Sequence, residues 1–261
     1  MSRIRGKAHE FLNAYEHMNS VFEEKFGYKL YFIGGTLLGF IRENDFLEND
    51  KDMDISYFSK YTNVADVRKE ILEIIDTLID SGEELYFIRN LDYSIVKNYF
   101  RWRVDERDRI DVMPTWTQDG MIYRPTFVAY EGTSDIILPL KKEKFYDHTV
   151  YIPNKPEIKL ANVYGDNWRT PDRGFKKKTR WNDSTKMVVQ DQLLFRKDAW
   201  PLIKKTNQWK EELTFREKLF VQLFSFKKHK FLAMMVPNRK KLKKGFFKKL
   251  RLSLNKKGNS N

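Results

Sequence analysis

Three aspartates are spaced two residues apart in one short segment of the sequence. Asp50, Asp52 and Asp54 alternate with Lys51 and Met53, and apolar residues follow. Because residues i and i+2 of a β-strand point to the same side, the three carboxylates can share one face. Crowded carboxylates repel one another and are costly to bury without a partner. A divalent cation relieves that repulsion, and oxygen ligands favour Mg²⁺ or Mn²⁺, which also bind phosphate.

A further aspartate interrupts a second apolar segment. Asp111 lies within Arg-Ile-Asp-Val-Met at residues 109–113, which we interpret as a strand. If the two strands are neighbours, Asp111 completes a metal-binding set with Asp52 and Asp54, and Asp50 is a candidate outer ligand. Such a set can bind one or two ions, activate a hydroxyl group and neutralise charge on a phosphoryl group. The alternative is that these aspartates are solvated strand residues facing nearby lysines and arginines.

A glycine-rich segment precedes the aspartates. Residues 34–39 read Gly-Gly-Thr-Leu-Leu-Gly and follow an apolar segment that we interpret as a strand. Glycines permit a tight turn and close approach of a ligand to the backbone, and a helix that begins there directs its N–H groups towards an anion. We therefore expect Gly34, Gly35 and Thr36 to bind phosphate, with Arg42 as a phosphate clamp. The alternatives are a purely structural turn and a helix-surface arginine.

These motifs occur in the order seen in the LicD/fukutin family of the nucleotidyltransferase-like superfamily, which DNA polymerase β typifies. Gly-Thr-Leu-Leu-Gly at residues 35–39 is followed by Asp-Lys-Asp-Met-Asp-Ile at 50–55 and Ile-Asp-Val-Met-Pro at 110–114. The resemblance extends over residues 28–172 and implies an α+β fold, with a mixed sheet of the polymerase-β type flanked by helices. One departure is Asn49, where bacterial members usually have Trp, and it leaves the Asp-x-Asp pair intact.

The resemblance implies an enzyme that transfers substituted phosphate groups. Family members transfer phosphocholine, ribitol phosphate or a related group from a CDP-linked donor to a sugar hydroxyl, and CMP is released. The resemblance implies that Asp52, Asp54 and Asp111 are catalytic, metal-binding residues. It also implies that the acceptor is a cell-surface glycan, such as a capsule, lipopolysaccharide or teichoic acid precursor. Two other functions stay open. One is transfer of a nucleoside monophosphate from an NTP to a small molecule, and the other is a non-catalytic basic module that binds membrane or nucleic acid.

Hydrophobic periodicity predicts the elements that position these residues. The acidic turn at 105–108 should join two strands as a hairpin, and Pro114 should end the second strand. Arg101, Arg103 and Arg109 are expected to pair with the acids of this turn, and the alternative is that they contact the donor near Asp111. Helices are expected at residues 8–26, 36–42, 64–79, 158–165, 184–198 and 211–225. Strands are expected at residues 29–34, 52–57, 86–89, 93–97, 99–104 and 109–113.

Charge is distributed unevenly along the chain. The net charge is +13, but residues 226–261 hold 13 Lys or Arg and no Asp or Glu, so the remainder is neutral. A nucleic-acid-binding protein would carry its basic residues more widely, so nucleic acid is not the expected partner. As a helix, residues 239–254 would gather Leu and Phe on one face and Lys elsewhere, which favours binding to an anionic membrane surface. The alternative is a solvated, disordered tail.

We divide the sequence into a nucleotidyltransferase-like catalytic core (1–180), a C-terminal helical extension (181–225) and a basic amphipathic tail (226–261). The chain is 41% hydrophobic and 15% aromatic, which suffices for a sizeable core, and it has no cysteine for disulfides or thiolate metal sites. No segment approaches the ~18–20 apolar residues of a membrane span or resembles a signal peptide. We therefore expect a cytoplasmic protein, peripheral on the inner face of the membrane.

Overall fold

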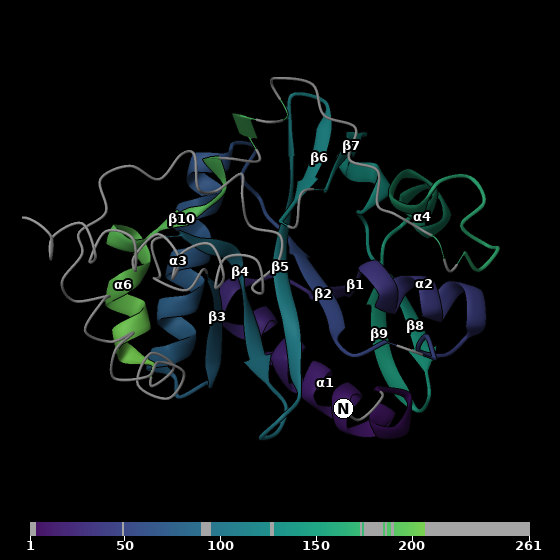
Figure 1. Ribbon diagram of the computed structural model, residues 1–261, viewed down its shortest axis with the longest axis horizontal. Helices are drawn as coiled ribbons and strands as arrows, with labels where there is room; N and C mark the ends of the chain where they lie inside the picture. The colour runs from purple at the N-terminus through teal and green to yellow at the C-terminus, as the bar shows by residue number, and fades with distance from the viewer. Residues whose placement is uncertain are drawn as a thin grey trace, which may run out of the picture. The chain divides into compact units, whose positions relative to one another are not determined.

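A mixed β-sheet lies at the centre of the fold (Figure 1). Its eight strands among the described residues are β1 (Tyr31–Phe32), β2 (Met53–Phe58), β3 (Leu85–Arg89), β4 (Ile95–Arg103), β5 (Arg109–Gln118), β6 (Met121–Arg124), β7 (Val128–Glu131) and β10 (Leu194–Phe195). The main path runs β1–β2–β5–β4–β10, while β3 pairs with β4, β6 with β5 and β7 with β6. β2 and β5 are parallel and the other pairs antiparallel. A separate hairpin comprises β8 (Lys141–Phe145) and β9 (His148–Ile152).

Helices flank the sheet, and local sequence explains where several begin and end. Gly27 ends α1 in the left-handed region, with φ of 71°, where glycine has no steric penalty. The Asn63 side chain caps α3 by accepting a hydrogen bond from the Asp66 amide at 2.9 Å. The helical elements are η1 (Ile4–Lys7), α1 (Ala8–Phe26), α2 (Gly34–Glu43), α3 (Val64–Asp80), η2 (Ser134–Ile136), α4 (Pro156–Tyr164) and α6 (Arg196–Lys205).

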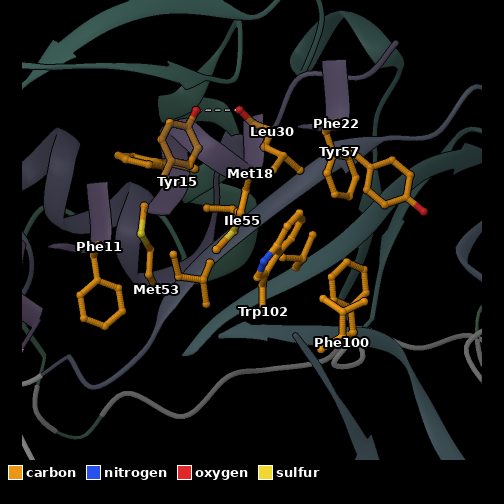
Figure 2. Packing of buried hydrophobic residues seen from close by; sticks show 14 of the residues in the cluster. Phe11, Tyr15, Met18, Phe22, Leu30, Met53, Ile55, Tyr57, Phe100 and Trp102 are labelled. Carbon is orange, nitrogen blue, oxygen red and sulfur yellow. Dashed lines mark hydrogen bonds between the residues drawn. The ribbon is translucent and has the colours of Figure 1, made fainter. Parts of the chain in front are cut away.

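One face of the sheet carries the larger hydrophobic core. Alternate residues of β2 and β4, including Ile55 and Trp102, pack with α1 residues such as Phe22 (Figure 2). Residues between them on the same strands point to the opposite face, because successive strand side chains alternate. Asp54 and Arg101 are among these intervening residues. The packing that forms the core therefore also directs the polar side chains to one common face.

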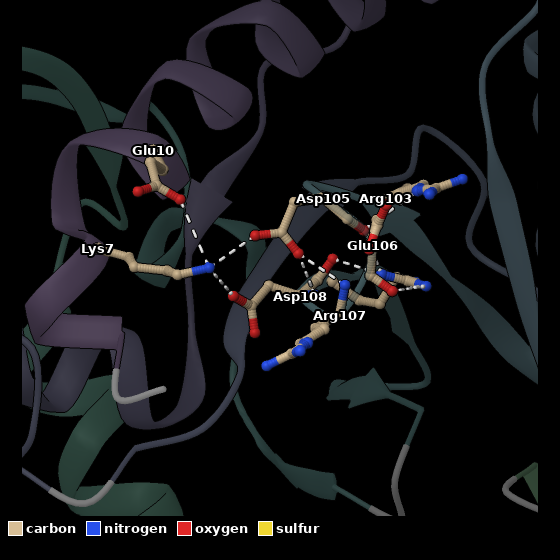
Figure 3. A network of polar contacts seen from close by, with 8 residues as sticks. Lys7, Glu10, Arg103, Asp105, Glu106, Arg107 and Asp108 are labelled. Atoms are coloured by element: carbon tan, nitrogen blue, oxygen red, sulfur yellow. Dashed lines mark hydrogen bonds and ion pairs between the residues drawn. The ribbon is translucent and has the colours of Figure 1, made fainter. Parts of the chain in front are cut away.

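A cluster of ion pairs ties the β4–β5 turn to the N-terminal segment (Figure 3). The ammonium of Lys7 lies 2.7 Å from a carboxylate oxygen of Asp105 and 2.7 Å from one of Asp108. The other oxygen of Asp105 accepts hydrogen bonds at 2.7 Å from the amides of Arg107 and Asp108. These contacts fix the hairpin that leads into β5, the strand bearing Asp111.

The structure corrects several expected elements. The strands expected at 93–97 and 99–104 form parts of one strand, β4, and β5 continues through Pro114 to Gln118. Pairing of β4 with β5 ends at Val112, so Pro114 lies where that edge of β5 has lost its partner and a missing N–H is tolerated. The helix expected at 184–198 is also wrong at its end, since β10 and the start of α6 occupy that segment.

The structure describes residues 4–48, 50–89, 95–125, 128–172, 174, 185, 187–188 and 191–206. The helix expected at 211–225, the basic tail at 226–261 and Asn49 lie outside the described residues, so the expectations about them stay predictions. Within the described ranges, no helix combines the length and the apolar character needed to cross a bilayer.

Candidate active site

Parallel pairing of β2 with β5 brings two of the predicted aspartates side by side. Asp54 in β2 lies directly opposite Asp111 in β5. Asp111 is only 4% exposed, and Asp54 is half-buried. The residue pattern left open whether these segments are neighbouring strands. The register shows that they are, and it places the two aspartates at matching positions on the face opposite the main core.

The glycine turn lies against the same carboxylates. The backbone amide of Asp54 donates to the Thr36 hydroxyl at 2.9 Å, and the Ile33 amide donates to the Asp54 carbonyl at 3.2 Å. A Cβ atom added at Gly34 would lie 2.3 Å from an Asp54 carboxylate oxygen, and Gly34 has a φ of +56°. One added at Gly35 would lie 2.6 Å from an Asp50 oxygen. A side chain at either position would therefore displace a carboxylate, and at Gly34 the positive φ would add backbone strain.

Asp50 and Asp52 are placed differently from the expected strand positions. Both precede β2, which begins at Met53, so only Asp54 of the three lies on the strand. Asp50 is partly buried against the start of α2, and its Oδ2 has no hydrogen-bond partner among the described residues. Asp52 is exposed. The segment therefore supplies one strand carboxylate and two from the approach to the strand.

The carboxylates influence one another electrostatically. Burial raises the pKa of Asp54 from 3.8 to about 7, and the charges of Asp111, Asp52 and Asp50 contribute to the rise. Burial and the charge of Asp52 raise the pKa of Asp50 to about 6. Burial raises the pKa of Asp111 as well, and Asp52 again adds to the effect. Asp54 therefore experiences the charge of each of the other three carboxylates, and Asp52 acts on all the others.

Arg101 corrects one prediction about the hairpin. It was expected to pair with the acids of the turn, but its Nε donates to Asp111 Oδ1 at 2.7 Å. The register explains this contact, because Arg101 in β4 lies directly opposite Asp111 in β5. The Arg101 guanidinium opposes the rise in the pKa of Asp111 and favours its ionised form. Arg103 and Arg109 do contact the turn, where both donate to the carbonyl of Asp105.

The chemistry of the donor set fits a hard divalent cation. All the candidate ligands are carboxylates, their mutual repulsion calls for positive charge, and Asp50 Oδ2 is buried without a partner. In the described part of the chain, no three His, Asp or Glu side chains are arranged to hold a metal ion. The ion pair to Arg101 directs Asp111 towards the guanidinium, so ion binding requires the carboxylates to reorient.

Arg42 lies in the last turn of α2, eight residues beyond Gly34. It donates to the Glu43 carboxylate at 2.9 Å and to the Trp168 carbonyl at 3.3 Å, while its Nε is buried without a hydrogen-bond partner among the described residues. Its assignment as a phosphate clamp stays a prediction.

Four further polar residues on the acidic face were not selected from the sequence. Lys97 and Tyr99 share a strand side with Arg101, and their side chains lie 3.3 Å apart. Strand alternation in β4 could have identified both. Arg124 and Lys159 come from β6 and α4 and are buried. Nothing in their local sequence signals proximity to Asp54, since it arises from long-range packing.

A mixed sheet with Asp54 and Asp111 on neighbouring parallel strands, beside a glycine turn that opens a helix, defines a nucleotidyltransferase-like domain. Residues 27–155 match the family model described as LicD/FKTN/FKRP, nucleotidyltransferase domain. Residues 27–155 therefore form a domain of the LicD family type.

The chain was also compared with solved structures and with curated proteins. One similar solved structure is the crystal structure of lincosamide antibiotic adenylyltransferase LnuA, lincomycin-bound. The match covers 68% of this chain and 92% of that one, with 15% identity and a TM-score of 0.33. No curated protein matches the chain.

Proposed function

We propose that this protein transfers a substituted phosphate group, such as phosphocholine or ribitol phosphate, from a CDP-linked donor to a sugar hydroxyl of a cell-surface glycan. Family membership supports a transferase of this class. The observation that carries the proposal is the pairing of Asp54 with Asp111 beside Gly34 and Gly35. Carboxylates that lie close together beside a helix N-terminus are suited to hold a cation that binds the oxygens of a diphosphate.

In this proposal the four aspartates bind the metal ion in different ways. Asp52, Asp54 and Asp111 hold Mg²⁺ or Mn²⁺, with Asp50 as an outer ligand, and the ion supplies positive charge that neutralises the diphosphate and the leaving group. The acceptor hydroxyl attacks the phosphorus distal to the cytidine. A new O–P bond forms, and the bond to the bridging oxygen breaks, so CMP leaves with its electron pair.

The residues of this chain position the reactants and take the proton. Asp111, whose ionised form Arg101 favours, either ligates the ion or accepts the hydroxyl proton. The first residues of α2, Gly34, Gly35 and Thr36, lie next to the acids, and their amides are suited to bind donor phosphate oxygens. Arg42 stands at the far end of the same helix as a further candidate phosphate ligand.

A donor screen tests this function. The purified full-length protein is incubated with CDP-choline or CDP-ribitol, a glycan extract and Mn²⁺ or Mg²⁺, and nucleotide products are separated by chromatography. The proposal predicts CMP that depends on the metal, the glycan and Asp54. Pyrophosphate released from an NTP, without CMP from any CDP-linked donor, would instead favour transfer of a nucleoside monophosphate.

We further propose that the protein acts at the inner face of the membrane on a lipid-linked acceptor. The basic, amphipathic sequence of residues 226–261 supports this placement, because lysines attract anionic lipids while Leu and Phe enter the interface. A donor of this kind is soluble, so the membrane contact would serve the acceptor.

A further inference from the structure

Two basic side chains lie buried, and no described residue offers either of them an anionic hydrogen-bond partner. Arg124 is 5% exposed and Lys159 is 3% exposed. Among the described residues, Nε and Nη1 of Arg124 have no hydrogen-bond partner. The Lys159 ammonium lies over the ring of Tyr31, 4.9 Å from its centroid. Burying a charge is costly unless it is paired. We therefore expect these two side chains to have an anionic hydrogen-bond partner that the described residues do not supply.

The fold brings both residues to the acidic face of the sheet. Arg124 in β6 lies opposite Val128 in β7, and Val128 packs in the same apolar cluster as Tyr31. Lys159 extends from α4, which contacts β7, and lies over Tyr31. Tyr31 in β1 belongs to the sheet face that also carries Asp54, as the β1–β2 register shows. Three elements distant in sequence thus converge beside the proposed catalytic site.

The directions of the pKa shifts agree with this placement. The charge of Arg124 opposes the rise in the pKa of Asp54 that burial causes. Burial lowers the pKa of Lys159, and the charge of Arg124 lowers it further. The Tyr164 phenol, whose pKa burial raises to about 12, responds to both Arg124 and Asp54. Two basic groups therefore repel each other next to the carboxylates, a situation that a multiply charged anion would relieve.

We infer that Arg124 and Lys159 bind the diphosphate group of the nucleotide-linked donor. This inference rests on the proposed function, in which a divalent cation neutralises Asp54, the carboxylate whose pKa the charge of Arg124 lowers. The two unpartnered guanidinium nitrogens then donate to phosphate oxygens, and Lys159 supplies a second positive charge. The diphosphate is held between the metal-binding carboxylates on one side and these two cations on the other.

A purely structural role predicts the opposite response to mutation. Removing a buried cation that stabilises the fold lowers the melting temperature. Replacing one that lacks a partner by an apolar residue of similar size relieves its desolvation and leaves the ligand-free protein at least as stable. Thermal stability without ligand and affinity for diphosphate therefore report on different roles of the same side chain.

The experiment measures binding of inorganic pyrophosphate in the presence of Mg²⁺ by isothermal titration calorimetry. Wild-type protein is compared with Arg124→Met, Lys159→Met and the control Lys142→Met, whose lysine is exposed on β8. We expect either core substitution to weaken binding by about 10- to 100-fold, the usual worth of a charge-assisted hydrogen bond. Lys142→Met should bind like wild type. If Lys159→Met does not fold, Lys159→Gln provides the same comparison.

Each outcome decides the inference. Weakened binding with an unchanged or raised melting temperature supports it. Wild-type affinity in folded Arg124 and Lys159 variants, or no pyrophosphate binding by wild type, overturns it. The donor screen is independent of this result: pyrophosphate binding that requires both cations, without CMP from any CDP-linked donor, would refute the proposed reaction and leave the anion site standing.

Discussion

Asp54 is the residue on which the proposed chemistry depends most, because it contacts the glycine turn and lies opposite Asp111. We predict that Asp54→Asn lowers the rate of CMP formation by hundreds-fold, equivalent to about 3–4 kcal/mol of transition-state stabilisation. The fold should persist, since asparagine keeps the size of the side chain. Circular dichroism and a metal-dependent assay check both points, with Asp119→Asn, in an exposed turn, as the matched control. Wild-type turnover by folded Asp54→Asn would contradict the assignment.

The raised pKa values of Asp54 and Asp50 predict how stability depends on pH without metal. Their folded-state pKa values, about 7 and about 6, exceed the ordinary value of 3.8, so the folded state binds protons more tightly than the unfolded state. The resulting stabilisation is complete below pH 3.8 and is lost as pH rises towards 7. In EDTA, the melting temperature should therefore fall between pH 5 and pH 7, after allowance for other groups.

The Asp54→Asn variant isolates this effect. It should show a smaller decline over the same pH range and melt above wild type at pH 8 in EDTA, by about 2–4 °C for each kcal/mol of relieved repulsion. Added Mn²⁺ should raise the melting temperature of wild type and have little effect on the variant. Identical pH profiles for the two proteins would show that Asp54 does not carry the raised pKa.

At the scale of elements, α2 must pack closely on the loop that leads to the acids. A Cβ atom added at Gly39 would lie 2.6 Å from the Asp45 carbonyl oxygen and 2.9 Å from the Leu47 amide nitrogen. We predict that Gly39→Ala destabilises the protein by about 1–3 kcal/mol, because backbone atoms cannot move aside as a flexible side chain can. Chemical denaturation measures the change. Gly6→Ala is the control, since a Cβ there meets nothing within 4 Å, and an equal effect of both would contradict this explanation.

The elements show which parts of the fold the sequence could reveal. Alternation in residues 52–57 and 109–113 identified the strands bearing Asp54 and Asp111, and the family resemblance indicated that they are neighbours. The sequence could not identify the partner of Arg101, because that contact depends on the antiparallel register of β4 with β5. The turn acids at 105–108 seemed closer in sequence, but Asp105 and Asp108 bind Lys7 instead.

Long-range packing is the second reason why the sequence could not predict all the residues around the site. The positions of Arg124 and Lys159 follow from how β6 and α4 approach β1, and neither residue lies in a recognisable motif. Pro114 was misjudged because its effect depends on whether a partner strand is present at that point. Local patterns thus identified the carboxylates and the glycine turn, whereas the basic residues around them required the tertiary structure.

At the scale of the whole molecule, the charge of the tail predicts membrane association. Deleting residues 226–261 should abolish sedimentation with vesicles that contain anionic lipid, since this segment carries the entire excess of 13 positive charges. Vesicles of neutral lipid should bind neither form. Protein that lacks residues 226–261 should still release CMP in a soluble assay. Equal sedimentation of full-length and shortened protein would exclude the tail as the membrane contact.

The arrangement of carboxylates makes one measurement the most direct test of the whole account. Crystals grown with Mn²⁺ and CDP are examined at a wavelength where manganese scatters anomalously. We predict an anomalous peak within about 2.0–2.3 Å of oxygens from both Asp54 and Asp111, next to the start of α2. Anomalous density located elsewhere, or none under conditions that saturate metal binding in solution, would contradict the claim that these two strands form a metal centre.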